Sequence, residues 1–304
     1  MKSNLFKAHL ALLGANVIYG ANYIIAKGIM PNKIGPSAFV FIRLFCGAIL
    51  FWIIKSFIKE RIAKKDLLRL ALCGLLGAAA NQLLFFNGLN LTSPIDASII
   101  ITSIPVMVLI FSAFLLKEKI TLNKLLGITI GGIGAVLLIW HGNTAQGTSS
   151  FLGNLLVFLN ACCYGLYLVI VKPLMVKYNS ITLISWVFLF GFVFMLPFGI
   201  GDLLATDFAA FDLNTYLVIG FVVIFTTFFA YLFNIYALNY VSPSVNGSYV
   251  YLQPAVSFIM VSFYAYVLGN SEYAQDINLV KILSCLLVVS GVYLISRKSK
   301  TKLA

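Results

Sequence analysis

Long apolar segments that carry almost no charge follow one another along nearly the whole sequence, and they limit its fold more than any other feature. Charged residues make up 10% of the 304 positions and hydrophobic residues 61%. A soluble domain has roughly 25% charged residues and about half apolar residues. So much apolar surface cannot be hidden in a soluble core of this size. The chain therefore needs a lipid bilayer as a second solvent.

The lengths of the apolar segments favour helices. A helix needs roughly 20 mostly apolar residues to cross a bilayer, and the sequence shows no sustained alternation of the kind that transmembrane β-strands require. We predict an all-α integral membrane protein with ten transmembrane helices. The first apolar segment contains several polar residues and lacks a small-residue cleavage site, so we expect a retained helix. The expected ranges are 8–29, 36–56, 68–89, 94–116, 123–140, 152–172, 181–201, 215–238, 243–268 and 278–296.

Basic residues are distributed unequally between alternate loops. One side of the predicted spans collects 17 of the 21 Lys and Arg residues, the other side has Lys27, Lys33 and Lys281, and Arg43 lies inside the second span. Because cytoplasmic loops collect Lys and Arg, we expect a multi-pass protein of the cell (inner or plasma) membrane with both termini in the cytoplasm. The net charge of +12 then reflects this topology, and we expect no nucleic-acid partner.

The two halves of the chain resemble each other. At an offset of 149 residues, Leu89-Asn90 matches Leu238-Asn239, Ser93-Pro94 matches Ser242-Pro243, and Pro105 matches Pro254. At an offset of 145 residues, Tyr19-Gly20 matches Tyr164-Gly165. Each copy holds five spans, so the second copy enters the membrane from the opposite side. Inverted repeats of this kind are typical of secondary transporters. We predict a first five-helix repeat over 1–142, a second over 150–298 and a cytoplasmic tail over 299–304.

Several segments resemble the EamA-type branch of the drug/metabolite transporter superfamily. They are YGANYIIAKG (19–28), FIRLFCGAIL (41–50), SPIDASIIITSIPV (93–106) followed by LLKEKIT (115–121), and GITIGGIGAVLL (127–138). The chain departs from the family pattern at Tyr19-Gly20, where the family has Trp-Gly, and no role transfers to Glu272 because its segment lacks the acidic closing motif. The resemblance implies ten helices around a central cavity, alternating access, and substrates such as amino acids or other small metabolites.

Polar residues recur on single faces of several predicted helices. Polar groups that face lipid are unfavourable, so these residues either line a water-filled pocket or join helices by hydrogen bonds. We predict a substrate pocket of tyrosine and amide side chains and keep helix joining as the alternative. Pro105 and Pro254 should each kink their helix. The candidate substrate-binding residues are Asn16, Tyr19, Tyr23, Gln82, Thr102, Tyr164, Tyr167, Tyr231, Asn234, Tyr249 and Gln253.

Charged and small residues inside the spans have two interpretations each. Asp96 has the spacing of a capping residue relative to Ser93, and proton coupling is its alternative role. Arg43 is either a neutralised structural charge or a contact for an anion. The Gly127-x-x-x-Gly131 motif serves helix packing within the chain or dimerisation, so we expect a monomer or a homodimer.

These features together predict a secondary transporter, an exporter of amino acids or related small metabolites, whose partners are its substrate and the lipid bilayer. A membrane receptor or scaffold is the alternative, and an intramembrane enzyme is a weaker one. The sequence shows no nucleophile–base or metal constellation and no nucleotide-binding signature. We therefore expect no catalytic residues, no metal and no cofactor.

Overall fold

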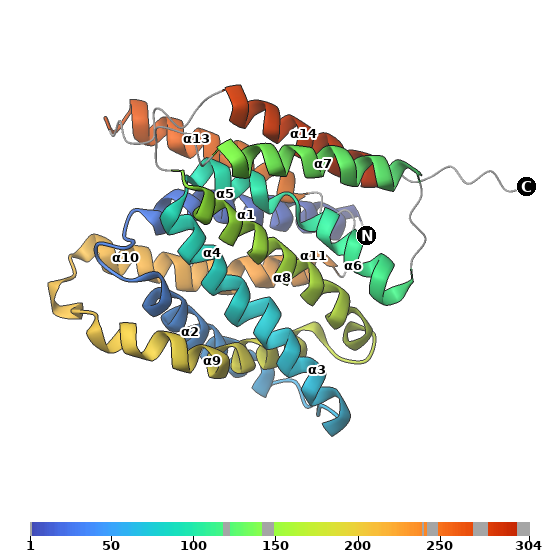
Figure 1. Cartoon of the computed structure of the whole chain (residues 1–304). Helices are drawn as coiled ribbons and strands as arrows, with labels where there is room; N and C mark the ends of the chain where they lie inside the picture. Colours follow the sequence, from blue (N-terminus) through green and yellow to red (C-terminus); the bar gives the residue numbers. More distant parts are fainter. Residues whose placement is uncertain are drawn as a thin grey trace, which may run out of the picture.

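The computed structural model describes residues 2–117, 122–141, 149–238, 240–241, 249–269 and 279–296, and these residues form helices and no strands (Figure 1). The helices fall into ten successive segments, as predicted. Seven of the helical stretches are long and apolar enough to cross a membrane, and α7 and α14 contain shorter apolar stretches. The segments are α1 (Lys2–Lys27), α2 (Pro36–Ser56), α3, η1 and α4 (Lys64–Gly74, Leu75–Ala79, Ala80–Leu91), α5 and α6 (Pro94–Ile101, Ile104–Leu116), α7 (Leu122–His141), α8 (Phe151–Met175), α9 (Ser180–Ala205), α10, η3 and α11 (Leu213–Phe221, Val222–Phe229, Ala230–Leu238), η4 and α13 (Tyr249–Tyr251, Leu252–Tyr266), and α14 (Leu279–Ser296).

Corresponding segments of the two halves are interrupted in the same way. A π-helical turn separates α3 from α4, and another separates α10 from α11. Just before Pro105, where we predicted a kink, the helix is interrupted, because α5 ends at Ile101 and α6 begins at Ile104. In the second half, α13 follows a short 3₁₀ turn and begins two residues before Pro254. Residues 242–248, which include the repeat match Ser242-Pro243, lie outside the described part of the chain.

Helix contacts are repeated across the two halves. In Figure 1, α7 runs beside α14 along one edge of the bundle and α2 beside α9 near the opposite edge, and each pair joins equivalent helices. The α4–α8 contact corresponds to the α11–α1 contact, and α6–α8 corresponds to α13–α1. These matched pairs are the contacts that a pseudo-two-fold axis between two copies produces. The first residues of α1 and the last residues of α14 also lie at the same end of the bundle (Figure 1).

The glycine of each Tyr-Gly motif explains one of these matched contacts. A Cβ added at Gly20 on α1 would lie 2.5 Å from Val256 Cβ on α13, and one added at Gly165 on α8 would lie 2.8 Å from Met107 Cβ on α6. Val256 and Met107 are separated by the repeat offset of 149 residues. Each glycine therefore lets a broken helix of the other half approach its backbone.

Small residues also bring α7 and α14 together. A Cβ added at Gly291 would lie 2.5 Å from the Gly131 nitrogen and 2.6 Å from the Gly127 carbonyl oxygen. Such distances require glycine at the crossing point. The Gly127-x-x-x-Gly131 motif is thus used for packing within the chain.

Candidate functional site

Four of the predicted tyrosines gather in the interior of the bundle. Tyr19 on α1 is close enough to Tyr164 on α8 and Tyr231 on α11 to interact with both electrostatically. The ring centroids of Tyr164 and Tyr167 are 5.5 Å apart, and Tyr231 packs edge-on against Phe188 at 5.3 Å. Tyr19 and Tyr164 are the tyrosines of the two Tyr-Gly motifs. The structure therefore brings equivalent positions of both halves together at one site, which we call the tyrosine cluster (Tyr19, Tyr164, Tyr167 and Tyr231).

The hydroxyl groups of the tyrosine cluster have unusual surroundings. A buried tyrosine hydroxyl normally finds a hydrogen-bond partner, yet no described residue forms a hydrogen bond with any of the four. None of these oxygens is among the fully enclosed polar atoms that lack a partner. The four side chains lie deep among the helices and still keep partly exposed surface. Their hydroxyls therefore keep surface that water or a solute can reach.

Arg43 places a positive charge beside the tyrosine cluster. Its Nε donates to the Thr227 hydroxyl at 2.9 Å, and its guanidinium carbon lies 4.6 Å from the centre of the Phe86 ring. Only 5% of the residue is exposed, and it interacts electrostatically with Tyr19 and Tyr231. Because an arginine keeps its charge in proteins, the site combines open hydroxyl groups with a permanent cation.

Three other predicted residues form a hydrogen-bonded chain between α1 and α13. The Tyr23 hydroxyl donates to Gln253 Oε1 at 2.7 Å, and Gln253 Nε2 donates to Asn16 Oδ1 at 2.9 Å. Asn16 Nδ2 in turn donates to the Leu12 carbonyl at 2.9 Å. All three side chains are buried. Their contacts are those of residues that join helices, which was the alternative to pocket lining.

The remaining candidates are not brought into the tyrosine cluster by hydrogen bonds. Thr102 Oγ1 donates to the Ile99 carbonyl at 2.6 Å, and Asn234 Nδ2 donates to the Ala230 carbonyl at 2.8 Å, within their own helices. The Tyr249 hydroxyl lies 2.8 Å from His9 Nδ1. Because His9 precedes Tyr19 by ten residues on α1, this contact is about 15 Å from the cluster along the helix axis.

Gln82 differs from the other amides. Its side chain is 4% exposed, and neither amide atom has a hydrogen-bond partner among the described residues. Gln82 precedes Phe86 by one helical turn on α4, so the two side chains share a face. An enclosed amide without partners is unfavourable by about 1–3 kcal/mol, so it calls for an explanation.

Asp96 occupies the first turn of α5, as the capping pattern predicted. Its backbone N–H donates to Ser93 Oγ at 3.1 Å. Its Oδ1 atom lies 2.8 Å from Lys281 Nζ on α14, and both side chains are at most 1% exposed. Asn154 Nδ2 on α8 donates to Asp96 Oδ2 at 3.4 Å. Three helices thus meet at a fully buried carboxylate.

Lys281, counted above with the lysines of the less basic side, is a buried residue of α14. Besides its contact with Asp96, it donates to Ser93 Oγ at 3.0 Å and to Ser149 Oγ at 3.2 Å. Lys27, counted in the same group, is also buried and donates to the Thr92 carbonyl. The sequence contains a signal for the Asp96–Lys281 pair. Each of the two residues lies at the start of an apolar span, and charged residues within transmembrane segments pair with one another.

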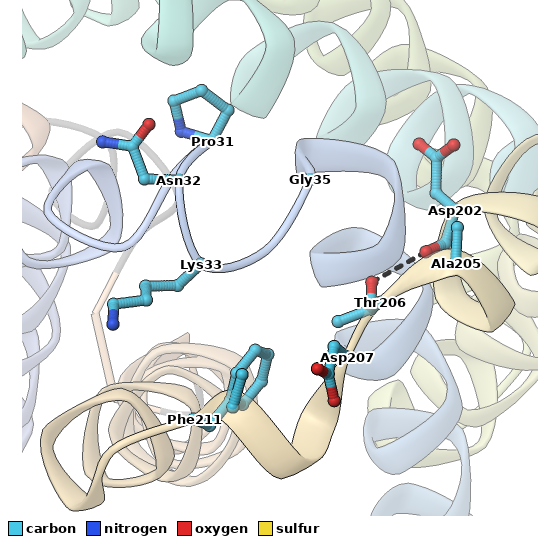
Figure 2. Close-up of a pocket in the computed structure, with 10 residues that line it drawn as sticks. Pro31, Asn32, Lys33, Gly35, Asp202, Ala205, Thr206, Asp207 and Phe211 are labelled. Atoms are coloured by element: carbon cyan, nitrogen blue, oxygen red, sulfur yellow. Dashed lines mark hydrogen bonds between the residues drawn. The ribbon is translucent and has the colours of Figure 1, made fainter.

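A surface pocket of about 550 Å³ lies where α1 leads into α2 and α9 ends (Figure 2). Figure 2 shows the exposed carboxylates of Asp202 and Asp207, and Thr206 Oγ1 donates to the Asp202 carbonyl at 2.7 Å. None of the predicted site residues lines this pocket. We therefore place the candidate site at the tyrosine cluster, where residues of both halves meet. The pocket is lined by Pro31, Asn32, Lys33, Gly35, Asp202, Ala205, Thr206, Asp207, Ala210 and Phe211.

Known proteins resemble the chain in sequence and in fold. The model of the EamA-like transporter family matches residues 6–140 and 151–297. An uncharacterized transporter of Archaeoglobus fulgidus is 30% identical over 265 residues, which cover 87% of this chain and 90% of the relative. A probable terminal-alkyne amino-acid exporter of Streptantibioticus cattleyicolor is 30% identical over 138 residues, or 45% of this chain and 46% of that protein. A solved crystal structure that is 15% identical aligns with a TM-score of 0.61 and covers 96% of this chain and 98% of that one.

Proposed function

The chain belongs to the EamA-like transporter family, and on this premise we propose that it is a secondary carrier that exports amino acids or related small metabolites by alternating access. The observation that carries the proposal is the set of open tyrosine hydroxyls in the interior. Hydroxyls that a solute can reach, with a cation beside them, are suited to bind a polar solute between the two halves. Carriers built from repeats bind their substrates at such a repeat interface.

Two observations support amino acids as the substrate class. Tyrosine rings can pack against the apolar part of a solute while their hydroxyls form hydrogen bonds with its polar groups. The relative from Streptantibioticus cattleyicolor is named as a probable amino-acid exporter. The similarity to that protein covers less than half of either chain, so it supports the chemical class and no particular amino acid.

We also propose that both termini lie in the cytoplasm. The excess of Lys and Arg on that side supports this orientation, and so does the position of the start of α1 and the end of α14 at one end of the bundle (Figure 1). A C-terminal green fluorescent protein fusion should then fluoresce, and a C-terminal alkaline phosphatase fusion should be inactive in cells. The reverse result would contradict the orientation.

In this orientation the buried Asp96–Lys281 pair lies toward the outer end of the bundle. It connects α5 with α14, and Asn154 and Thr92 extend the polar contacts to α8 and to the connection between α4 and α5. These enclosed contacts support a conformation that is closed at the outer end. Alternating access then requires this network to open.

Counterflow in proteoliposomes tests the carrier function. Vesicles that contain the purified full-length protein are loaded with one unlabelled L-amino acid and exposed to the same amino acid in labelled form. We expect transient accumulation of label for at least one amino acid, and none in vesicles without protein. No exchange with any of the L-amino acids would count against amino-acid transport.

Asp96 stays a candidate proton carrier as well as a partner of Lys281. If it carries the coupled proton, Asp96→Asn should abolish the pH dependence of transport while counterflow persists. If the pair is only structural, the variant should keep the pH dependence of the wild type. Initial rates measured over a range of pH distinguish the two roles.

A further inference from the structure

Arg43 is a buried cation whose terminal donors are unused. Its Nε is occupied by Thr227, and its flat face lies on Phe86. No described residue accepts a hydrogen bond from Nη1 or Nη2, the atoms that carry the other four N–H donors of a guanidinium. These two nitrogens are not among the fully enclosed polar atoms that lack a partner. They therefore keep surface that a small solute can reach.

No acidic side chain in the described part of the chain neutralises this charge. The six described carboxylates are placed elsewhere: Asp96 with Lys281, Asp66 with Lys177, Asp212 near Lys33, Glu60 at the Asn179 backbone, and Asp202 and Asp207 exposed at the surface pocket. A buried charge without a counter-ion is strongly unfavourable. The site is therefore suited to an anion that arrives from outside the chain.

Gln82 points independently to the same place. Phe86, which carries the guanidinium on its ring, lies one turn further along α4. Both polar atoms of the Gln82 amide are buried and have no hydrogen-bond partner among the described residues. The amide can therefore form hydrogen bonds with a ligand once a ligand or a helix movement exposes it. Two polar side chains that are each more than nine-tenths buried thus have unused hydrogen-bonding groups on adjoining helices.

We propose that Arg43 binds the carboxylate of the transported molecule; this assignment rests on the proposed carrier function. The planar fork of a guanidinium matches the two oxygens of a carboxylate. One positive charge balances a monoanion, whereas a phosphate dianion would leave negative charge uncompensated. Tyr19 and Tyr231 interact electrostatically with the cation. They offer hydroxyls to the polar part of the ligand and ring faces to its apolar part. The amide oxygen of Gln82 then accepts a hydrogen bond from the ammonium group of the ligand.

The test pairs a change in the protein with a change in the ligand. Counterflow and thermal stabilisation are measured for L-amino acids, for the corresponding amino-acid amides, which lack the carboxylate, and for glycerol 3-phosphate, which carries a phosphate instead. The variants are Arg43→Gln, which removes the charge, and Arg43→Lys, which keeps the charge and loses the fork. Lys33→Gln is the matched control because it removes one positive charge at an exposed position. Size-exclusion profiles identify any variant that does not fold.

We expect Arg43→Gln to raise the half-saturating concentration of the acid about 10- to 100-fold and that of the amide less than about twofold. Arg43→Lys should give an intermediate loss, and it provides the same comparison if Arg43→Gln does not fold. Equal losses for acid and amide, or no loss for the acid, would overturn the assignment. If the wild-type protein exchanges amides or glycerol 3-phosphate but no amino acid with a free carboxylate, the assignment of Arg43 is overturned and the carrier function is left intact. A wild-type protein that exchanges none of the probes would overturn both proposals.

Discussion

Lys281 Nζ lies 2.8 Å from Asp96 Oδ1, and neither side chain has more than 1% of its surface exposed. The two residues are 185 positions apart, and they connect the first half of the chain to its last helix. The second half has Val245 at the position that the repeat offset assigns to Asp96. The ion pair therefore departs from the internal two-fold relationship, and the two ends of the carrier need not behave alike.

Removing one member of this pair should destabilise the protein more than removing both. Lys281→Met leaves a buried carboxylate without its counter-ion, and we expect it to lower the free energy of unfolding by about 3–5 kcal/mol. The double variant Asp96→Leu/Lys281→Met removes both charges and should recover most of that loss. Thermal unfolding in detergent measures the effect. Additive losses in the double variant would show that the two side chains are not coupled.

Tyr19 and Tyr23 should respond differently to the loss of a hydroxyl. Tyr23→Phe breaks the hydrogen bond to Gln253 and leaves its buried oxygen unpaired, so we expect a loss of about 1–3 kcal/mol in stability. Tyr19→Phe breaks no hydrogen bond to a described residue and should change stability by less than about 0.5 kcal/mol. It should instead weaken substrate binding about 5- to 10-fold. A Tyr19→Phe protein with unchanged counterflow would argue against a substrate contact at this hydroxyl.

Alanine at Gly20 should disturb the contact between the two halves. The new Cβ would lie 2.5 Å from Val256 Cβ and 3.2 Å from the Gln253 carbonyl oxygen, and overpacking of this kind costs about 1–3 kcal/mol. Gly165→Ala should behave similarly because it meets Met107 Cβ at 2.8 Å. Gly132→Ala is the control, since nothing lies within 4 Å of its added Cβ. Thermal unfolding of the three variants should separate the two crowded positions from the open one.

Gln82→Met should separate function from stability. The substitution removes two buried amide atoms that lack partners and keeps a side chain of similar length. We expect stability to stay the same or to rise by about 1–2 kcal/mol, while counterflow falls. Asn87→Ala on the same helix is the comparison, because the Asn87 amide already donates to the Leu83 carbonyl at 2.8 Å. A Gln82→Met protein that transports like the wild type would remove Gln82 from the binding site.

Much of the architecture follows from local sequence. Apolar runs specify helices in a bilayer because backbone groups cannot be left unpaired in hydrocarbon. Pro105 specifies the break between α5 and α6 because it lacks an amide hydrogen. The paired Tyr-Gly motifs indicate that the chain contains two related halves. Each of these features lies within one helix or recurs at the repeat offset. It can therefore be recognised in the sequence without knowing which helices are in contact.

The role of each polar residue depends on which side chains of other helices lie next to it. Tyr19 and Tyr23 lie one turn apart on α1 and look equivalent in the sequence. In the fold, Tyr23 meets Gln253 from another helix, while the Tyr19 hydroxyl meets no described partner. Helical spacing specifies that the two share a face, but the side chains on neighbouring helices decide whether that face is closed or open.

The sequence by itself thus determined that this chain is a helical membrane protein built from two related halves. Only the packing of distant helices shows that Lys281 neutralises Asp96 and that Arg43 keeps donors beside the tyrosine cluster that no described residue uses. The physical reason is the range of the interactions. Hydrophobic transfer and backbone hydrogen bonding act within a segment. The pairing of buried charges depends on which distant segments come within about 4 Å of each other.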